Sequence, residues 1–362
     1  MSDIPMSDDL VNYYPRETLI AFTQTYLKAL GTTDEEATIT ADGIVTAAGR
    51  WHPGKGQGLE KLFRLTVQCG NGGINVGAEF EILKETPAVA LVDAHKGLGY
   101  VVGVKAMKLA VEKAKTVGTG SVLVRHSNHF GQAGYHAEIA AKAGMIGISM
   151  TNAGAEMAPW GGKTAVLATN PWGLAIPRAK GNPILLDMAL TMSGQGMVKW
   201  AYREGVSIPD NWVLTAEGRR STDPAEFIAA DGETFAGTQL PIGEFKGYGL
   251  SLFTDVITGV LSGALFGTTV FTDITNFDVG HFLMALNPNT FMLFDDFQSR
   301  LEQLITEIKS AEPINPGDEI YLPGEPEYRR EQKTLETGIP INVKTVEKLR
   351  EISKAQGVVC PL

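Results

Sequence analysis

The fold class is decided by residues 88–151, AVALVDAHKGLGYVVGVKAMKLAVEKAKTVGTGSVLVRHSNHFGQAGYHAEIAAKAGMIGISMT. Short apolar runs alternate here with longer segments in which apolar residues recur at helical spacing. The runs are VALVDA, SVLVRH and IGISMT, and the helical segments are residues 101–117 and 135–143. Strands separated by helices are typical of an α/β protein. We therefore predict an α/β fold with these runs in its central sheet.

Further elements are expected on both sides of this stretch. Before it, residues 17–30 form a helix with Gly31 as its stop, Asp34 caps a second helix that continues to Gly49, and residues 59–69 form a third. The glycine- and proline-rich segment WHPGKGQG, residues 51–58, is predicted as a loop. After the stretch we expect strands at 183–187 and 281–286 and helices at 297–310 and 343–355.

Composition excludes several classes of protein. The chain has 362 residues, 44% of them hydrophobic, and a formal net charge of −10. Its size suits two domains, and its scattered basic residues form no stripe that could follow a nucleic-acid backbone. The apolar segment 247–267 contains Asp255 and internal glycines and serines, which favour a buried helix over a membrane span. We predict a protein that binds neither nucleic acid nor membranes.

The cysteines and the N-terminus bear on the compartment. Cys69 and Cys360 are the only cysteines, and they lie far apart and outside any C-x-x-C arrangement. The first residues, MSDIPMSDDL, are acidic where a signal peptide is basic. We therefore expect a cytoplasmic protein.

Three glycines suggest a dinucleotide site at first sight. Gly97, Gly99 and Gly103 follow VALVDA and open a helix, where glycines can let a helix N-terminus approach a pyrophosphate. The usual fingerprint, however, has a two-residue second gap, and no strand ending in Asp or Glu lies about 20 residues further on. We interpret these glycines as sites of tight helix packing.

Histidines gather at SNHFGQAGYH, residues 127–136, where a strand turns into a helix. His126, His129 and His136 have a spacing that could suggest a metal site, but the intervening glycines and the lack of a local acidic residue argue against one. An imidazole titrates near neutral pH and is well placed at such a turn for proton transfer. We predict this role for His129, with a simple bond to nearby backbone as the alternative.

Three other segments present polar groups at turns. In ATNPWG, residues 168–173, Pro171 keeps Asn170 extended, so that its amide can meet a nicotinamide carboxamide or a phosphate, although an ordinary Asx turn fits equally. Asp187 ends a strand before several hydroxyls and glycines, where a carboxylate could orient a histidine or tune its pKa. Lys246-Gly247 opens a helix, and an ammonium there suggests an anionic partner such as a cofactor phosphate.

The order of these segments resembles the malate/L-lactate dehydrogenase family, whose members include ureidoglycolate dehydrogenase, diketogulonate reductase, sulfolactate dehydrogenase and piperideine-2-carboxylate reductase. The matching segments are SNHFGQAGYH, ATNPWGLAIP, LLDMALTMS, FKGYGLSLFTDVITGVLSG, GHFLMAL and LPGEPE. The resemblance implies a mixed-sheet, non-Rossmann dinucleotide-binding domain at residues 121–295. It also implies a second α/β domain that carries the N-terminal helices, formed by residues 1–120 and 296–362.

The resemblance further implies a homodimer, an active site between the domains and near the partner chain, and NADH or NADPH as the cofactor. The expected cofactor contacts are Ser127, His129, Thr169, Asn170, Asp187, Met188, Ala189, Leu190, Thr191, Met192, Ser193, Lys246, Gly247, Gly324, Glu325 and Pro326. The preference between NADH and NADPH stays open.

The chain departs from the family at one motif. The family usually carries Ser-His-Gly-x-x-Arg-Leu after its second helix, and that histidine is the expected proton donor to the substrate. Here Gln57 to Leu62 takes this position, with Lys61 in place of the arginine. Counting forward from Ala41-Asp42, Lys55-Gly56 falls there instead, which implies a two-residue insertion.

Three interpretations of the departure stay open: His52 swings into the site, Lys55 acts as the acid, or His129 alone handles the proton. An amide at Gln57 could bond a carbonyl but could not deliver a proton. We favour His129 paired with Asp187, assisted by His52 or Lys55.

The expected reaction is hydride transfer between a nicotinamide and C2 of a small 2-oxo or 2-hydroxy acid. Lys61 and Arg64, with Gln57, would bind this carboxylate substrate. Two alternatives are a reductase of cyclic imino acids and a non-catalytic relative that only binds the dinucleotide. A family member that has changed its substrate or lost activity is also possible.

Overall fold

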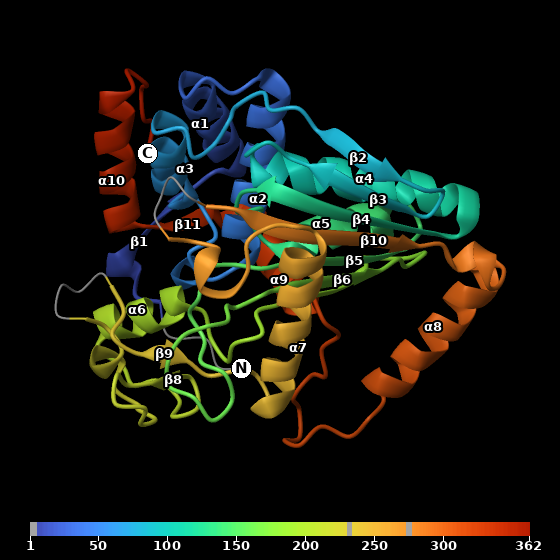
Figure 1. Cartoon of the computed structure of the whole chain (residues 1–362). Helices are drawn as coiled ribbons and strands as arrows, with labels where there is room; N and C mark the ends of the chain where they lie inside the picture. Colours follow the sequence, from blue (N-terminus) through green and yellow to red (C-terminus); the bar gives the residue numbers. More distant parts are fainter. Residues whose placement is uncertain (1–5, 230–233, 273–276) are drawn as a thin grey trace.

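A seven-stranded mixed sheet forms the centre of the molecule (Figure 1). The computed structural model describes residues 6–229, 234–272 and 277–362. The strand order is β2-β3-β4-β10-β5-β6-β7, with bounds Glu81–Glu85, Val89–Asp93, Thr119–Ser127, Val279–Leu286, Ile146–Thr151, Trp172–Ile176 and Ile184–Met188. Among these strands β3 and β4 are parallel neighbours, and the other neighbours are antiparallel. The predicted α/β fold with a mixed sheet is confirmed.

Two helices pack closely on this sheet because glycines in the strands admit their backbones. A Cβ on Gly120 in β4 would lie 2.0 Å from a carbonyl oxygen of α4, Gly99–Val117. A Cβ on Gly147 in β5 would lie 2.2 Å from a carbonyl oxygen of α5, Ala133–Lys142. The core between them is made of small and branched apolar side chains. The strands and helices predicted within residues 88–151 are confirmed.

The two ends of the chain build a second core together. Strand β1, Val11–Tyr14, pairs antiparallel with β11, Ile339–Asn342. Around this pair pack α1, α2, α3 and α10, with bounds Arg16–Ala29, Asp34–Arg50, Lys61–Gly70 and Val343–Ala355. The cap of α2 is Thr33, because its hydroxyl accepts the Glu36 N–H while the Glu36 carboxylate accepts the Thr33 N–H. Our assignment of the cap to Asp34 was wrong by one residue.

The division into two domains remains a prediction. Residues from the first and last parts of the chain do share the second core. The sheet, however, contains strands from both sides of the predicted boundary after residue 120, because β3 pairs with β4 along its whole length. A third, smaller core surrounds Trp200 of α6, Gln195–Glu204, next to the short strands β8, Val213–Leu214, and β9, Thr238–Gln239.

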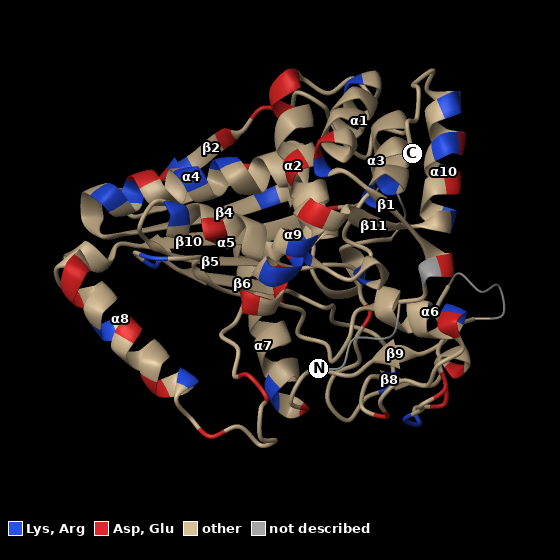
Figure 2. Ribbon diagram, turned by 180° about the vertical axis from the view of Figure 1, so that it is seen from behind, with Lys and Arg blue, Asp and Glu red and all other residues tan. Residues whose placement is uncertain are grey.

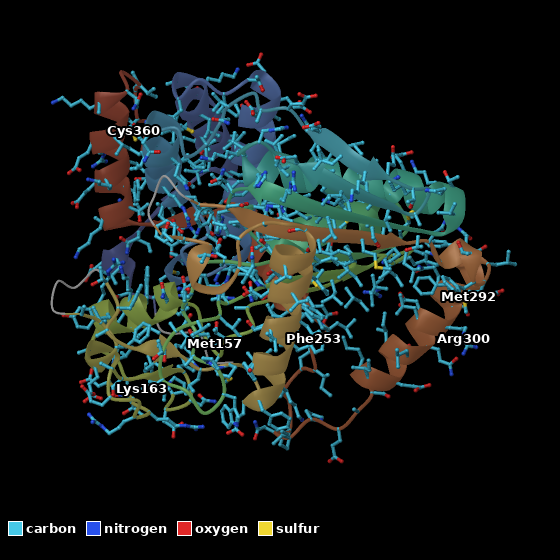
Figure 3. All side chains as sticks on the ribbon, viewed as in Figure 1. Met157, Lys163, Phe253, Met292, Arg300 and Cys360 are labelled. Atoms are coloured by element: carbon cyan, nitrogen blue, oxygen red, sulfur yellow. The ribbon has the colours of Figure 1, made fainter. Side chains whose placement is uncertain are left out.

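Helix α7, Phe245–Asp255, passes into a π-helical turn, Val256–Leu261. Its apolar side chains are not all buried, since Phe253 is 66% and Leu261 65% exposed. Phe253 projects from α7 in Figure 3. Our prediction of one buried helix over 247–267 was therefore wrong in its length and, for the single chain, in its burial. In the described part of the chain, no helix is both long and apolar enough to cross a membrane.

Helices α8, Phe294–Lys309, and α9, Glu325–Thr337, complete the described helices. Basic and acidic residues are mixed along α8, α9 and α10 (Figure 2). These three helices therefore present no continuous basic face.

Candidate active site

The loop between α2 and α3 is anchored to α6. His52 is 3% exposed, its Nδ1 accepts the Gly54 N–H at 2.9 Å, and its ring meets the Trp200 ring edge-on at a centroid distance of 4.8 Å. A Cβ on Gly196 of α6 would lie 2.2 Å from the Gly54 carbonyl oxygen, so glycine is needed at this contact. The structure gives no support to His52 swinging into the site.

Lys55 and Gln57 lie further along the same loop. The Lys55 ammonium sits over the Trp51 ring, 4.2 Å from its centroid. The Gln57 Oε1 atom is buried and has no hydrogen-bond partner among the described residues. A buried acceptor without a partner is expected to meet one when a ligand binds. Gln57 therefore stays a candidate for substrate binding, while Lys55 is engaged by an aromatic ring.

Two cations stand on one face of α3. Lys61 is its first residue and Arg64 follows one turn later. The Arg64 guanidinium stacks on the Phe277 ring at 4.1 Å, and neither cation has a hydrogen bond or ion pair within the described part of the chain. Burial, followed by the charge of Arg64, lowers the pKa of Lys61 to about 8. Burial also lowers the pKa of Arg64.

His129 lies beside these cations and is neutral. Its Nδ1 accepts the Gly131 N–H at 3.1 Å, which assigns the ring proton to Nε2. Burial, then the charges of Lys61 and Arg64, lowers the pKa of His129 well below its usual value. Lys61 and Arg64 are thus close enough to His129 for their charges to act on it, and its ring is a hydrogen-bond donor and not a charged acid.

Two residues of this cluster escaped sequence reasoning. Burial raises the pKa of Glu156 to about 7, although the charges of Lys61 and Arg64 act to lower it. Tyr100 is 2% exposed, and its hydroxyl has no partner among the described residues. No local motif marks either residue, because Glu156 follows a turn and Tyr100 sits in an apolar helix.

Asp187 is close to the start of α5 and not to His129. Its Oδ2 accepts the Gly134 N–H at 2.7 Å, and no hydrogen bond or ion pair joins it to His129 in the described structure. Burial raises the pKa of Asp187 to about 7, opposed by the Gly134 N–H and by the charge of Lys55. Among the described residues, Asp187 therefore bonds the N-terminus of α5, and its pairing with His129 stays a prediction.

Ser127 lies in the protein interior, two residues before His129. It is fully buried, and its hydroxyl is 2.8 Å from Nε2 of His281, whose Nδ1 is 2.8 Å from the Thr151 hydroxyl. The Phe130 ring stacks between His281 and His136 at 4.5 and 4.4 Å. The structure thus gives Ser127 a structural partner and does not support direct contact with a cofactor.

The other segments expected to contact a cofactor meet around β7. The Leu190 N–H bonds the Thr169 carbonyl oxygen, and a Cβ on Gly324 would lie 2.9 Å from Leu185 of β7. The segment 187–193 and the turn 324–326 are thereby neighbours. Met188 pairs with Trp172, Met192 donates its N–H to Leu240, and the Thr191 hydroxyl bonds the Ser193 carbonyl oxygen. Ala189 adjoins them in the chain.

Several polar groups of this region fit a dinucleotide. The Gln132 Nε2 and Asn170 Oδ1 atoms are both buried without a partner in the described structure. A donor and an acceptor of this kind match the two ends of a carboxamide. Lys246 is exposed in the first turn of α7, and Gly247 packs on Ile242. Glu325 is instead occupied, since it accepts the Leu322 N–H and pairs with Lys309; Pro326 begins α9 next to it.

The glycines after β3 let helix α4 pack closely on its neighbours. A Cβ on Gly99 would lie 2.1 Å from the Asn128 carbonyl oxygen, and one on Gly103 would lie 2.5 Å from the His136 ring. Their interpretation as packing sites is confirmed. They hold the His129 segment against α4.

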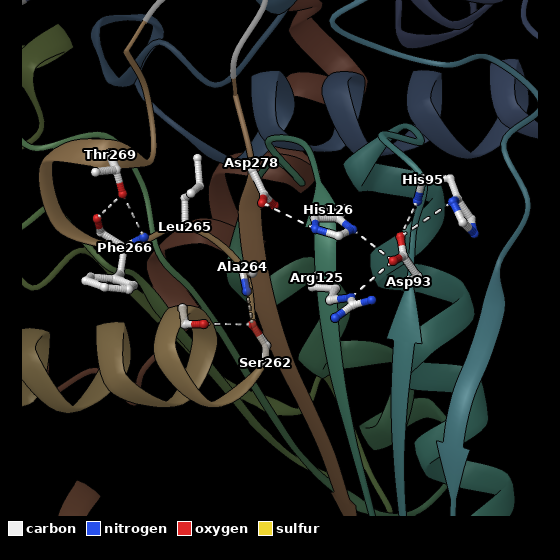
Figure 4. A network of polar contacts seen from close by, with 12 residues as sticks. Asp93, His95, Arg125, His126, Ser262, Ala264, Leu265, Phe266, Thr269 and Asp278 are labelled. Carbon is white, nitrogen blue, oxygen red and sulfur yellow. Dashed lines mark hydrogen bonds and ion pairs between the residues drawn. The ribbon is translucent and has the colours of Figure 1, made fainter.

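His126 belongs to a separate polar network (Figure 4). Its Nδ1 is 2.8 Å from the Asp93 carboxylate, which also accepts from Arg125, and Asp278 lies on its other side. Within the described residues, no group of three His, Cys, Asp or Glu side chains could hold a metal ion.

Two cavities adjoin these segments. One, of about 460 Å³, lies between the loop after α2, α6 and the start of α10, and Gln57, Glu60 and Lys199 are among its lining residues. The other, of about 310 Å³, borders the turn before α9, where Pro323 and Glu325 line it.

A model of the family described as malate/L-lactate dehydrogenase matches residues 14–350 of the chain. The chain belongs to this family. A malate dehydrogenase of Pyrococcus abyssi is 40% identical over 95% of both chains. An L-sulfolactate dehydrogenase of Methanocaldococcus jannaschii is 38% identical over 92% of this chain and 94% of its own. The solved structure of a malate dehydrogenase of Pyrococcus horikoshii covers 99% of both chains with a TM-score of 0.88 at 35% identity.

The comparisons confirm three predictions. They are the malate/L-lactate dehydrogenase family, its fold, and an NAD(P)-dependent dehydrogenase that acts on 2-hydroxy acids. Among the relatives, a ureidoglycolate dehydrogenase is specified for NAD(+) and a (2R)-3-sulfolactate dehydrogenase for NADP(+). The family therefore spans both cofactors.

Proposed function

We propose that this family member interconverts a small 2-hydroxy acid and its 2-oxo acid, with malate and sulfolactate as the first candidates. The observation that carries the proposal is that Lys61 and Arg64 stand on one face of α3, beside the neutral His129, with no hydrogen bond or ion pair from the described residues to either side-chain cation. Cations that lack a protein partner in a partly buried site are ready to bind a carboxylate. Both acids carry a second anionic group, which suits a site with two cations.

The chain's own residues would divide the work of binding. The planar guanidinium of Arg64 can hold a carboxylate with two parallel hydrogen bonds. The Nε2–H of His129 can donate to a substrate oxygen, and the Gln57 amide can donate or accept. A bound nicotinamide would supply or accept the hydride at C2. The Gln132 and Asn170 amides would orient its carboxamide, the 187–193 segment would border it, and Lys246 would face a phosphate.

The proposal is tested by absorbance at 340 nm with NADH or NADPH and a panel of oxaloacetate, sulfopyruvate, pyruvate, and pyruvate with methylamine. Turnover of at least one 2-oxo acid supports it. Turnover confined to the mixture with methylamine would instead assign imine reduction. Cofactor binding with no turnover would indicate a protein that only binds the dinucleotide. Arg64→Ala should raise KM for the favoured acid, with the exposed Lys354→Ala as a matched loss of one cation.

We also propose a homodimer that forms through the exposed apolar side chains of α7 and its π-helical turn. Phe253 and Leu261 lead this face, which includes Phe245, Leu252, Val256 and Val260. Contiguous apolar surface of this kind marks association sites, and most soluble oligomers are homo-oligomers, most often dimers. The cytoplasmic location stays a prediction. Both cysteines carry free thiols, as a reducing compartment would leave them.

A further inference from the structure

Reduction of a 2-oxo acid needs a proton at the C2 oxygen when the hydride reaches carbon. His129 cannot supply it as an imidazolium, because its Nδ1 already accepts the Gly131 N–H at 3.1 Å. Protonation at Nδ1 would turn that bond into a contact between two donors. The neighbouring charges of Lys61 and Arg64 oppose a positive ring as well. His129 is therefore left as a hydrogen-bond donor through Nε2.

The other side chains considered for this task are engaged elsewhere. The Nδ1 of His52 accepts the Gly54 N–H while the ring packs on Trp200. The Lys55 ammonium sits on the Trp51 ring. The Gln57 amide can donate a hydrogen bond but does not release a proton. Of the residues predicted to serve the substrate, this leaves Lys61 and Arg64 on α3, and a guanidinium holds its proton too tightly to transfer it.

We propose that Lys61 is the proton donor to the C2 oxygen, a step that rests on the proposed reaction of 2-oxo acids. Lys61 is the first residue of α3, where the positive end of the helix dipole disfavours a cation. No hydrogen bond or ion pair of the described residues occupies its ammonium. The carbonyl and carboxylate oxygens of a 2-oxo acid lie side by side, so one ammonium can contact both while Arg64 holds the carboxylate.

The surroundings of Lys61 suit proton release near neutral pH. Burial and the charge of Arg64 lower its pKa to about 8, while Glu60 and Glu156 act in the opposite direction. His129 and Tyr100 complete the titratable groups of the cluster, and both are uncharged at neutral pH because burial lowers the pKa of His129 and raises that of Tyr100. A donor whose pKa lies near the working pH is protonated in a large fraction of the molecules and also releases its proton readily.

The step balances without a further reactant. The hydride from the reduced nicotinamide forms the new C–H bond at C2, and the π pair of the C2=O bond moves to oxygen. That oxygen takes a proton from the Lys61 ammonium, which becomes a neutral amine and regains a proton from water. In the direction of oxidation, the neutral amine accepts the hydroxyl proton.

Lys61→Arg tests the proposal, because it keeps the positive charge but holds its proton too tightly to give it away. We expect kcat for reduction to fall about 100-fold or more, with KM and cofactor binding little changed. Lys61→Ala should be rescued in part by added alkylamines at rates that vary with the pKa of the amine, because a purely electrostatic or structural role would not follow that pKa. A Lys61→Arg enzyme with kcat near that of the unchanged protein would refute the proposal.

A second measurement needs no turnover. Acetic anhydride labels neutral amines, so peptide mass spectrometry of the full protein across pH values reports the pKa of each lysine. Lys61 should become reactive with a midpoint near pH 8. A midpoint for Lys61 near pH 10.4, the ordinary value of a lysine side chain, would overturn the inference. Failure of the proposed function would look different, since the unchanged protein would then turn over no 2-oxo acid whatever the midpoint of Lys61.

Discussion

Replacing Glu138 with leucine should destabilise the protein strongly, because it strands a buried cation between three helices. The Arg50 guanidinium at the end of α2 donates to both carboxylate oxygens of Glu138 in α5, at 3.0 and 3.2 Å. It also donates to Glu331 of α9 at 2.8 Å, and the Tyr328 hydroxyl donates to Glu138. The two side chains of the main pair are only 6% and 4% exposed.

The size of the effect follows from this burial. Removing one partner of a buried ion pair costs about 3–5 kcal/mol, because the remaining charge has lost its solvent and its partner. Glu331 is 19% exposed and compensates Arg50 only in part. We therefore expect Glu138→Leu to lower the free energy of unfolding by about 3 kcal/mol or more, measured from urea unfolding followed by circular dichroism.

A matched pair provides the control. Arg178 and Glu302 are also joined by two hydrogen bonds, at 2.9 and 2.9 Å, but are 19% and 43% exposed. Glu302→Leu should therefore cost less than about 1 kcal/mol. Removing both Arg50 and Glu138, as Arg50→Met with Glu138→Leu, should recover part of the loss. Equal losses for the two single leucine variants would contradict the reasoning from burial.

Three other predictions follow from the site and its supports. Glu156→Gln should lower the pKa of Lys61, because it removes a negative charge that raises this pKa. The alkaline limb of the pH profile of kcat/KM for reduction should therefore move to lower pH. An unmoved limb would show that the charge of Glu156 does not affect the group that titrates there. Gly99→Ala should reduce both stability and turnover, because its Cβ would lie 2.1 Å from the Asn128 carbonyl oxygen, whereas Gly70→Ala has open space and should be neutral by thermal melting. Phe253→Glu should yield monomers in light scattering if its exposed face joins two copies, and an unchanged mass would remove this face as the interface.

Local patterns predicted the sheet core well. The alternation of apolar runs and helical spacing in residues 88–151 corresponds to β3, α4, β4, α5 and β5 in the structure. Strand β6 and helices α6 and α9 were not predicted. Strand β6 directly follows Pro171, and the segment around this proline was predicted as a turn. Helix α9 begins next to Gly324 and Pro326, which are residues typical of loops. Their formation depends on neighbours far away in sequence, such as the pairing of β6 with β5 and β7.

The site divides in the same way. Motif order along the chain predicted the family and named Lys61 and Arg64 as residues for the substrate carboxylate, and the structure places both on one face of α3. The glycines Gly97, Gly99 and Gly103 were correctly assigned to packing. The sequence could not show what Asp187 bonds, because only the fold brings the Gly134 N–H to its carboxylate.

The amino-acid sequence by itself determined the α/β class, the family and the residues that could form a carboxylate site, because these depend on local periodicity and on the order of motifs. Only the tertiary structure decided which of these residues can give up a proton. That property depends on burial and on charges brought together from separate elements: Arg64 from α3, Glu156 from a turn and His129 from the loop after β4. Protonation is set by a three-dimensional neighbourhood, and no sequence spacing encodes it.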